Sequence, residues 1–85
     1  MDNLYLVPLK ALMAVATAKE ENIQGTRVLA LEQLRGLAGR AYVSEHMASD
    51  AAFMEGLQRV VDTTTLIQAT AVVQLLSEIA RVLEF

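Results

Sequence analysis

The sequence predicts an all-α fold of about four main helices in a single domain, residues 1–85. Apolar residues recur at three- and four-residue spacings along most of the chain, which is the period of an amphipathic helix. Strict alternation of apolar and polar residues never lasts more than a few positions, and the turn dipeptides of β-hairpins are missing. A chain of this length also has room for only one small hydrophobic core.

The first helix is predicted from Leu4 or Pro8 to Lys19. Proline is tolerated in a first helical turn because its missing N–H would have no intrahelical partner there. The residues expected to face the core fall at the spacing of one helix face, and they are Leu9, Leu12, Met13 and Ala16.

The second helix is predicted from Gln24 or Thr26 to Ala38, after the charged break KEENIQG. Thr26 is a candidate N-cap, since its hydroxyl can accept a bond from a free backbone N–H. Gly39 is a candidate C-terminal cap, because glycine adopts the left-handed conformation that ends many helices. The residues expected to point inward are Val28, Leu31, Leu34 and Ala38.

The segment RAYVSEHMA is predicted as a short helix or turn in which Tyr42, Val43 and Met47 are buried. The third main helix starts at Ser49 or Asp50, which are both good N-cap residues, and the polar run DTTT ends it. Its core stripe is the clearest in the chain and consists of Phe53, Leu57, Val60 and Val61.

The last helix is predicted to begin at Thr65. Gln68 follows at the spacing of a capping box, in which each of the two side chains bonds the backbone N–H of the other residue. Further apolar residues widen the stripe beyond one face, so this helix needs neighbours on two sides. Its inner stripe is expected to be Val72, Leu75, Leu76, Ile79 and Leu83.

Two segments of the chain follow the same order of features. Both LKALMAVATAKEENIQGTRVLALEQLRGLA and FMEGLQRVVDTTTLIQATAVVQLLSEIA contain a helix, a polar break, the pattern I-Q-x-T and a second helix. Both end in Leu-x-x-Leu/Ile-Ala. The two I-Q-x-T patterns are interpreted as matched helix starts rather than as chemistry, so Gln24 and Gln68 are not catalytic candidates. A period of about 40–47 residues is typical of armadillo and HEAT repeats.

The chain therefore resembles armadillo repeats, with one unit at about 4–39 and a second at 41–85. The resemblance implies a right-handed stack of helices, and a small four-helix bundle is the alternative. Many armadillo proteins hold an extended peptide with the asparagine of an LSNLA motif. Gly36 and Glu78 stand at the matching positions here, and there is no Trp, so that binding mode is not implied.

The composition favours association with another protein or a second copy. Hydrophobic residues make up 54% of the chain, and its mean hydropathy is +0.38, which is more apolar surface than one small core can cover. Helical repeats also need about three units or more, with polar caps at the ends. We expect a homodimer, docking on a protein partner, or membership of a larger assembly. The candidate interface residues are Leu6, Val7, Val73, Val82 and Phe85.

Charge and composition argue against several other classes of function. The net charge is -3 and the basic residues are scattered, so no nucleic-acid partner is expected. No run of about 18 apolar residues lacks a charge, so no membrane partner is expected. Asp2 and Lys10 argue against a signal peptide. The absence of Cys suits a cytoplasmic location.

No pattern of residues indicates catalysis, a cofactor or a metal. His46 is the only His and has no second His or Cys to complete a metal site. The predicted function is therefore a non-enzymatic protein-interaction or assembly module. The alternative is a small dimeric helical bundle that binds a small ligand near His46 and Tyr42, or serves as an enzyme subunit.

Three helix-surface ion pairs are also expected, namely Glu32/Arg35, Glu55/Arg59 and Glu78/Arg81.

Overall fold

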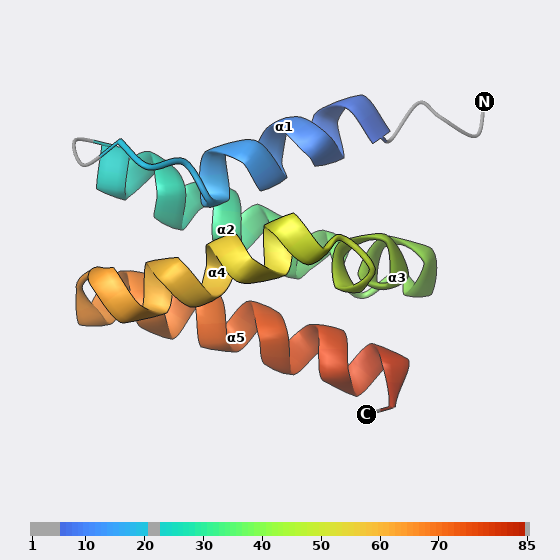
Figure 1. The fold of residues 1–85 in the computed structure, drawn as a ribbon. Helices are drawn as coiled ribbons and strands as arrows, with labels where there is room; N and C mark the ends of the chain where they lie inside the picture. Colours follow the sequence, from blue (N-terminus) through green and yellow to red (C-terminus); the bar gives the residue numbers. More distant parts are fainter. Residues whose placement is uncertain (1–5, 21–22, 85) are drawn as a thin grey trace.

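The computed structural model describes residues 6–20 and 23–84, and every regular element in these ranges is a helix. The all-α prediction is confirmed, with four longer helices and one short helix. The relation to armadillo repeats stays a prediction. In chain order the helices are α1 (Leu6–Ala16), α2 (Gln24–Leu37), α3 (Ala41–Ala48), α4 (Ala51–Thr63) and α5 (Leu66–Leu83) (Figure 1).

Figure 1 shows α1 and α5 at opposite sides of the molecule, with α2 and α4 between them. α2 packs against both α1 and α5, while α4 packs against α5 and also contacts α3 and α1. All five helices contribute to one hydrophobic core. A residue from each helix is at most 1% exposed, and these residues are Leu9, Leu31, Met47, Leu57 and Leu75.

The core stripes predicted for the four longer helices are confirmed. Every residue in them is buried or half-buried, because the helical period places them on one face of each helix. The half-buried members lie at the margins of these faces, and they are Leu12, Val28, Val61, Leu76 and Leu83. Asp50 is confirmed as the N-cap of α4, where its Oδ1 accepts a bond from the Phe53 N–H at 3.0 Å.

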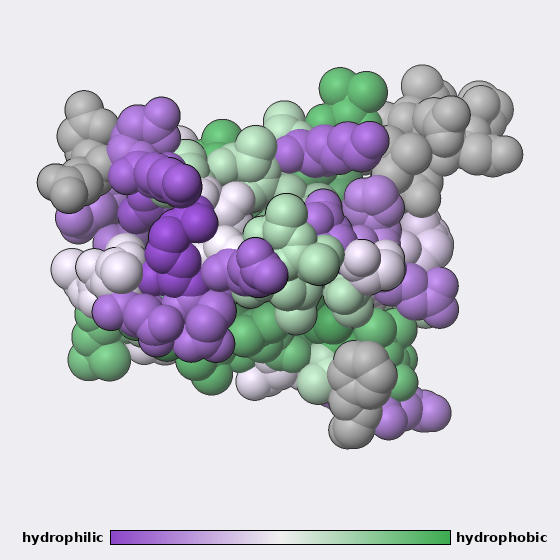
Figure 2. Space-filling model, viewed as in Figure 1, coloured by the Kyte–Doolittle hydropathy of each residue, from purple (hydrophilic) through white to green (hydrophobic). Residues whose placement is uncertain are grey.

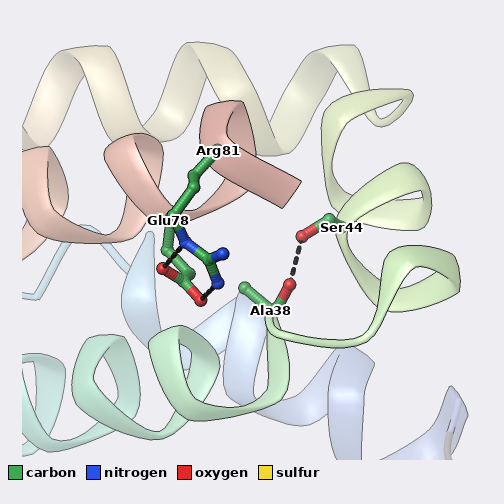
Figure 3. Close-up of polar contacts among 4 residues, drawn as sticks. All are labelled: Ala38, Ser44, Glu78 and Arg81. Atoms are coloured by element: carbon green, nitrogen blue, oxygen red, sulfur yellow. Dashed lines mark hydrogen bonds and ion pairs between the residues drawn. The ribbon is translucent and has the colours of Figure 1, made fainter. Parts of the chain in front are cut away.

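Both cap predictions for α2 are wrong. The N-cap is Ile23, which makes no side-chain cap bond, so Thr26 lies inside the first turn. At the other end Ala38 keeps a right-handed conformation, and no described glycine has a positive φ, so Gly39 is not a left-handed cap. The Ser44 hydroxyl instead donates to the Ala38 carbonyl at 2.6 Å and holds the turn between α2 and α3 (Figure 3).

The short helix α3 is confirmed, but one of its three predicted core residues is wrong. Val43 and Met47 are buried, whereas Tyr42 is 49% exposed. The third inward position belongs to Ser44, which is fully buried and bonded to Ala38. A helix this short turns only one face to the core, and that face runs through positions 43, 44 and 47, so Tyr42 lies outside it.

The capping box predicted for α5 is also wrong. Thr65 does occupy the N-cap position, but it makes no side-chain cap bond. Gln68 is 1% exposed, and its amide oxygen accepts a bond from Arg27 of α2. Its Nε2 lies 3.4 Å from the Thr65 hydroxyl, a long contact. The side chain of Gln68 therefore joins two helices instead of closing the end of its own.

The predicted end of the first helix at Lys19 is wrong, because α1 ends at Ala16. The Thr17 hydroxyl donates to the Met13 carbonyl at 2.9 Å in the last turn. The carbonyls that follow bond guanidinium groups of other helices, so no further turn of backbone bonds forms.

Candidate functional site

A buried arginine joins three segments at one end of the molecule. Arg27 lies near the start of α2 and is 4% exposed. Its Nη1 donates to Oε1 of Gln68 at 2.5 Å. Its Nη2 donates to the carbonyls of Ala18 at 2.5 Å and Glu20 at 2.7 Å, both in the loop between α1 and α2. One guanidinium therefore connects α2, α5 and this loop.

Arg59 of α4 reaches the same region. Its side chain is half-buried, and Nη2 donates to the carbonyl of Thr17, directly after α1. The last carbonyls of a helix have no intrahelical donor and carry partial negative charge, so cationic donors stabilise that end. Arg59 and Arg27 together hold the end of α1 against α4 and α2.

Of the three predicted surface ion pairs, the described residues form one. Arg81 donates to Glu78 from Nε at 3.0 Å and from Nη2 at 2.6 Å (Figure 3). This hydrogen bond lowers the pKa of Glu78 below its ordinary value and raises the pKa of Arg81. The other two predicted pairs are wrong, because Arg35 donates to Gln74 at 3.2 Å and Arg59 bonds the loop.

A cavity of about 480 Å³ lies between the α1–α2 loop and the turn from α4 to α5. Among the described residues its charged lining is Lys19, Arg27, Arg59 and Glu20, which are three cations and one carboxylate on a chain whose net charge is -3. Figure 2 shows hydrophilic residues gathered at this end of the molecule. The rest of the lining is Ala18, Gln24, Val60, Thr63, Thr64 and Thr65.

This cluster of cations was not found from the sequence. Its members come from the α1–α2 loop, α2 and α4, and they are scattered along the chain with no basic run. The burial of Arg27 could not be predicted from its residue type either, since arginine is rarely fully buried. Only the packing of the three segments brings the charges together.

The exposed face of α5 forms a second feature. Leu66, Ile67 and Val73 are 82%, 71% and 53% exposed. Beside them, a shallow groove of about 320 Å³ runs between α5 and α2. Figure 2 shows hydrophobic residues along the edge of the molecule formed by α5. The lining of the groove is Val28, Glu32, Leu66, Ile67, Thr70, Ala71 and Gln74.

The candidate interface residues do not form one surface in the described part of the chain. Val7 of α1 is 76% exposed and Val73 of α5 is 53% exposed, but these helices lie at opposite sides of the molecule (Figure 1). Val82 is half-buried. The side chain of Leu6 and all of Phe85 lie outside the described residues. Leu66 and Ile67 are the most exposed large hydrophobic residues of α5, and they were not predicted as interface residues although both fall opposite its core stripe.

His46 is half-buried in α3. Neither His46 nor Tyr42 lines the two cavities above. Within residues 6–20 and 23–84, no three His, Asp or Glu side chains come together in a way that could hold a metal ion.

The length and composition of α5 would also allow it to cross a membrane. The helix from Leu66 to Leu83 has a mean hydropathy of 1.4, and 28% of its residues are buried. A helix in the core of a soluble protein can have the same length and composition. The expectation of no membrane partner therefore stays a prediction.

No protein-family model matches the chain, and no curated protein or solved structure matches it. The two surfaces are therefore interpreted from their own geometry.

Proposed function

We propose that this protein is a non-enzymatic assembly module that pairs with a second copy of itself through the exposed face of α5. The observation that carries the proposal is the exposure of Leu66, Ile67 and Val73 on one helix. Fully burying a large aliphatic side chain contributes about 1.5–3 kcal/mol. Exposed apolar residues that gather on one face mark interaction surfaces more often than isolated ones do.

The charge distribution supports a second copy as the occupant. Each chain carries a net charge of -3, so two copies repel one another least when they meet through faces without charged residues. The stretch LIQATAVVQLLS, which begins α5, contains no charged residue. The first charge on the helix is Glu78, and it is already paired with Arg81. The first part of α5 is therefore suited to a contact between two acidic chains.

The shape of this surface also suits two-fold pairing. In a two-fold dimer the same surface of both chains forms the contact. That surface must therefore contain both the side chains that project and the groove that receives them. Leu66 and Ile67 project beside the groove that they line with α2. The surface of one chain is 5356 Å². A standard interface, which takes about 800 Å² from each partner, would therefore cover only a small part of it.

Sedimentation velocity over a range of concentrations tests the proposal. The wild-type protein should be a dimer at micromolar concentration. Ile67→Glu and Val73→Glu should each give a monomer with an unchanged circular dichroism spectrum. Val7→Glu is the matched control, since Val7 is 76% exposed on α1 at the other side of the molecule, and this variant should remain dimeric.

Two results would contradict the proposal. One is a wild-type monomer up to millimolar concentration, which would leave a different protein or a membrane as the occupant of this face. The other is dissociation of the dimer by Val7→Glu but not by Ile67→Glu, which would place the contact on α1.

A further inference from the structure

The charge on Arg27 is not balanced by any acid in the described residues. Buried arginine is normally paired with a carboxylate, because an unpaired buried charge is strongly destabilising. Arg27 is 4% exposed, and the three hydrogen bonds that it makes to described residues all go to neutral acceptors. Within residues 6–20 and 23–84 the one ion pair is Glu78–Arg81, which does not involve the cavity lining.

Arg27 also keeps unused donors. A guanidinium has five N–H donors, and the three bonds from Nη1 and Nη2 account for three of them. Its buried Nε has no partner among the described residues. Both N–H groups of Nη2 are already used, so Arg27 would contribute its charge and single hydrogen bonds to an anion rather than a bidentate pair.

Further groups around the cavity favour an anion. Lys19 and Arg59 line the same space as Arg27. Gln24 and Thr65, which also line it, stand at the starts of α2 and α5, and neither helix has a side-chain cap. Free N–H groups at a helix start carry partial positive charge and bind phosphate.

The size of the cavity indicates more than a bare ion. Small-molecule sites typically measure about 300–1,000 Å³, and this cavity measures about 480 Å³. Ala18 and Val60 give it a small apolar wall, while three Thr residues add hydroxyl groups to the lining. We propose that this cavity binds a small organic phosphate, with the phosphate held by Arg27 and Arg59 and the organic part against Val60.

Protein-observed NMR titration tests the site with sn-glycerol 3-phosphate as the probe, at constant ionic strength. Saturable chemical-shift changes should appear at residues that line the cavity. The probe should also bind more tightly than inorganic phosphate does. Arg59→Gln should weaken binding about tenfold, because it removes one charged hydrogen bond to the phosphate. Arg35→Gln is the control, because Arg35 is exposed on α2 and does not line the cavity.

Lys19→Gln serves as a second test, since Lys19 is exposed and its loss should leave the fold intact. It should also weaken binding severalfold, and added salt should weaken binding further. All titrations are repeated in Ile67→Glu, so that a failure of the dimer proposal does not affect this result.

Three outcomes would overturn the proposal. The first is the absence of any saturable shift up to about 10 mM of the probe. Binding would then be weaker than a specific small-molecule site requires. The second is equal weakening by Arg35→Gln and Arg59→Gln, which would show a general effect of charge. The third is binding only to vesicles that contain phosphatidic acid and not to the free phosphate ester, which would show attraction to a charged surface.

Discussion

Nη1 of Arg27 donates a hydrogen bond to Oε1 of Gln68 at 2.5 Å, across 41 positions of the sequence. This bond joins the start of α2 to the first turn of α5 and gives the two I-Q-x-T patterns different roles. Gln68 is 1% exposed and bonded to Arg27, whereas Gln24 is exposed at the start of α2. The matched glutamines are therefore not equivalent in the structure.

Gln68→Leu should destabilise the protein by about 2 kcal/mol, because it removes an acceptor from a buried charged donor. Gln24→Leu is the matched control and should change the free energy of unfolding by less than about 0.5 kcal/mol, as exposed substitutions usually do. Urea unfolding followed by circular dichroism measures both. Equal effects of the two substitutions would show that the bond to Arg27 contributes nothing.

Gly56→Ala should destabilise the protein by about 1–3 kcal/mol, the usual cost of overpacking. A Cβ at Gly56 would lie 2.7 Å from both Cβ and Cγ2 of Thr17, so α4 could not approach the end of α1 as closely. The contact is with a short, branched side chain that has little room to move away.

Gly36→Ala is the control for this substitution, because a Cβ there meets nothing within 4 Å. Alanine is a better helix former than glycine, so this variant should be more stable by about 0.5–1 kcal/mol. Thermal unfolding of the two variants should therefore shift in opposite directions. A shift of the same sign in both would mean that the contact between Gly56 and Thr17 is not limiting.

Asp50→Ala should cost about 1 kcal/mol, the usual value for the loss of an N-cap side chain. The carboxylate of Asp50 accepts a bond from the Phe53 N–H, whereas Thr65 makes no such bond at the start of α5. Thr65→Ala should therefore cost clearly less. A larger loss of stability in Thr65→Ala than in Asp50→Ala would contradict this assignment of the caps.

The ion pair of Glu78 and Arg81 should make a small, acid-sensitive contribution to stability. The hydrogen bond from Arg81 lowers the pKa of Glu78 in the folded state below its ordinary value of 4.5. The unfolded state then binds the proton more readily, so the contribution is present above pH 4.5 and is lost as the pH falls through the lowered pKa.

Glu78→Gln removes this titration. The difference in the free energy of unfolding between Glu78→Gln and the wild-type protein should be constant above pH 5 and should shrink below pH 4.5, the ordinary pKa of the group. The effect should be small because the side chain of Arg81 is 67% exposed. A difference that grows on acidification would contradict the direction of the pKa shift.

Local patterns account for what was predicted correctly. Helical periodicity placed the core stripes of the four longer helices, because a helix must turn its apolar face to the core wherever that core lies. The N-cap at Asp50 was also predictable, since it depends only on residues within one turn. Several failures, such as those at the C-terminal end of α2, at the capping box of α5 and at the end of α1, have a common cause, because Ser44, Arg27 and Arg59 bond these places from other helices.

The amino-acid sequence by itself determined the all-α class, the positions of the helices to within a few residues, and the face that each longer helix buries. These features follow from the period of apolar residues and from bonds within single turns. The tertiary structure alone decided that Gln68 is bonded to Arg27, that Arg59 holds the end of α1, and that cations from separate segments line one cavity. Such contacts join residues far apart in the chain, so they depend on how the helices pack and leave no periodic signal in the sequence.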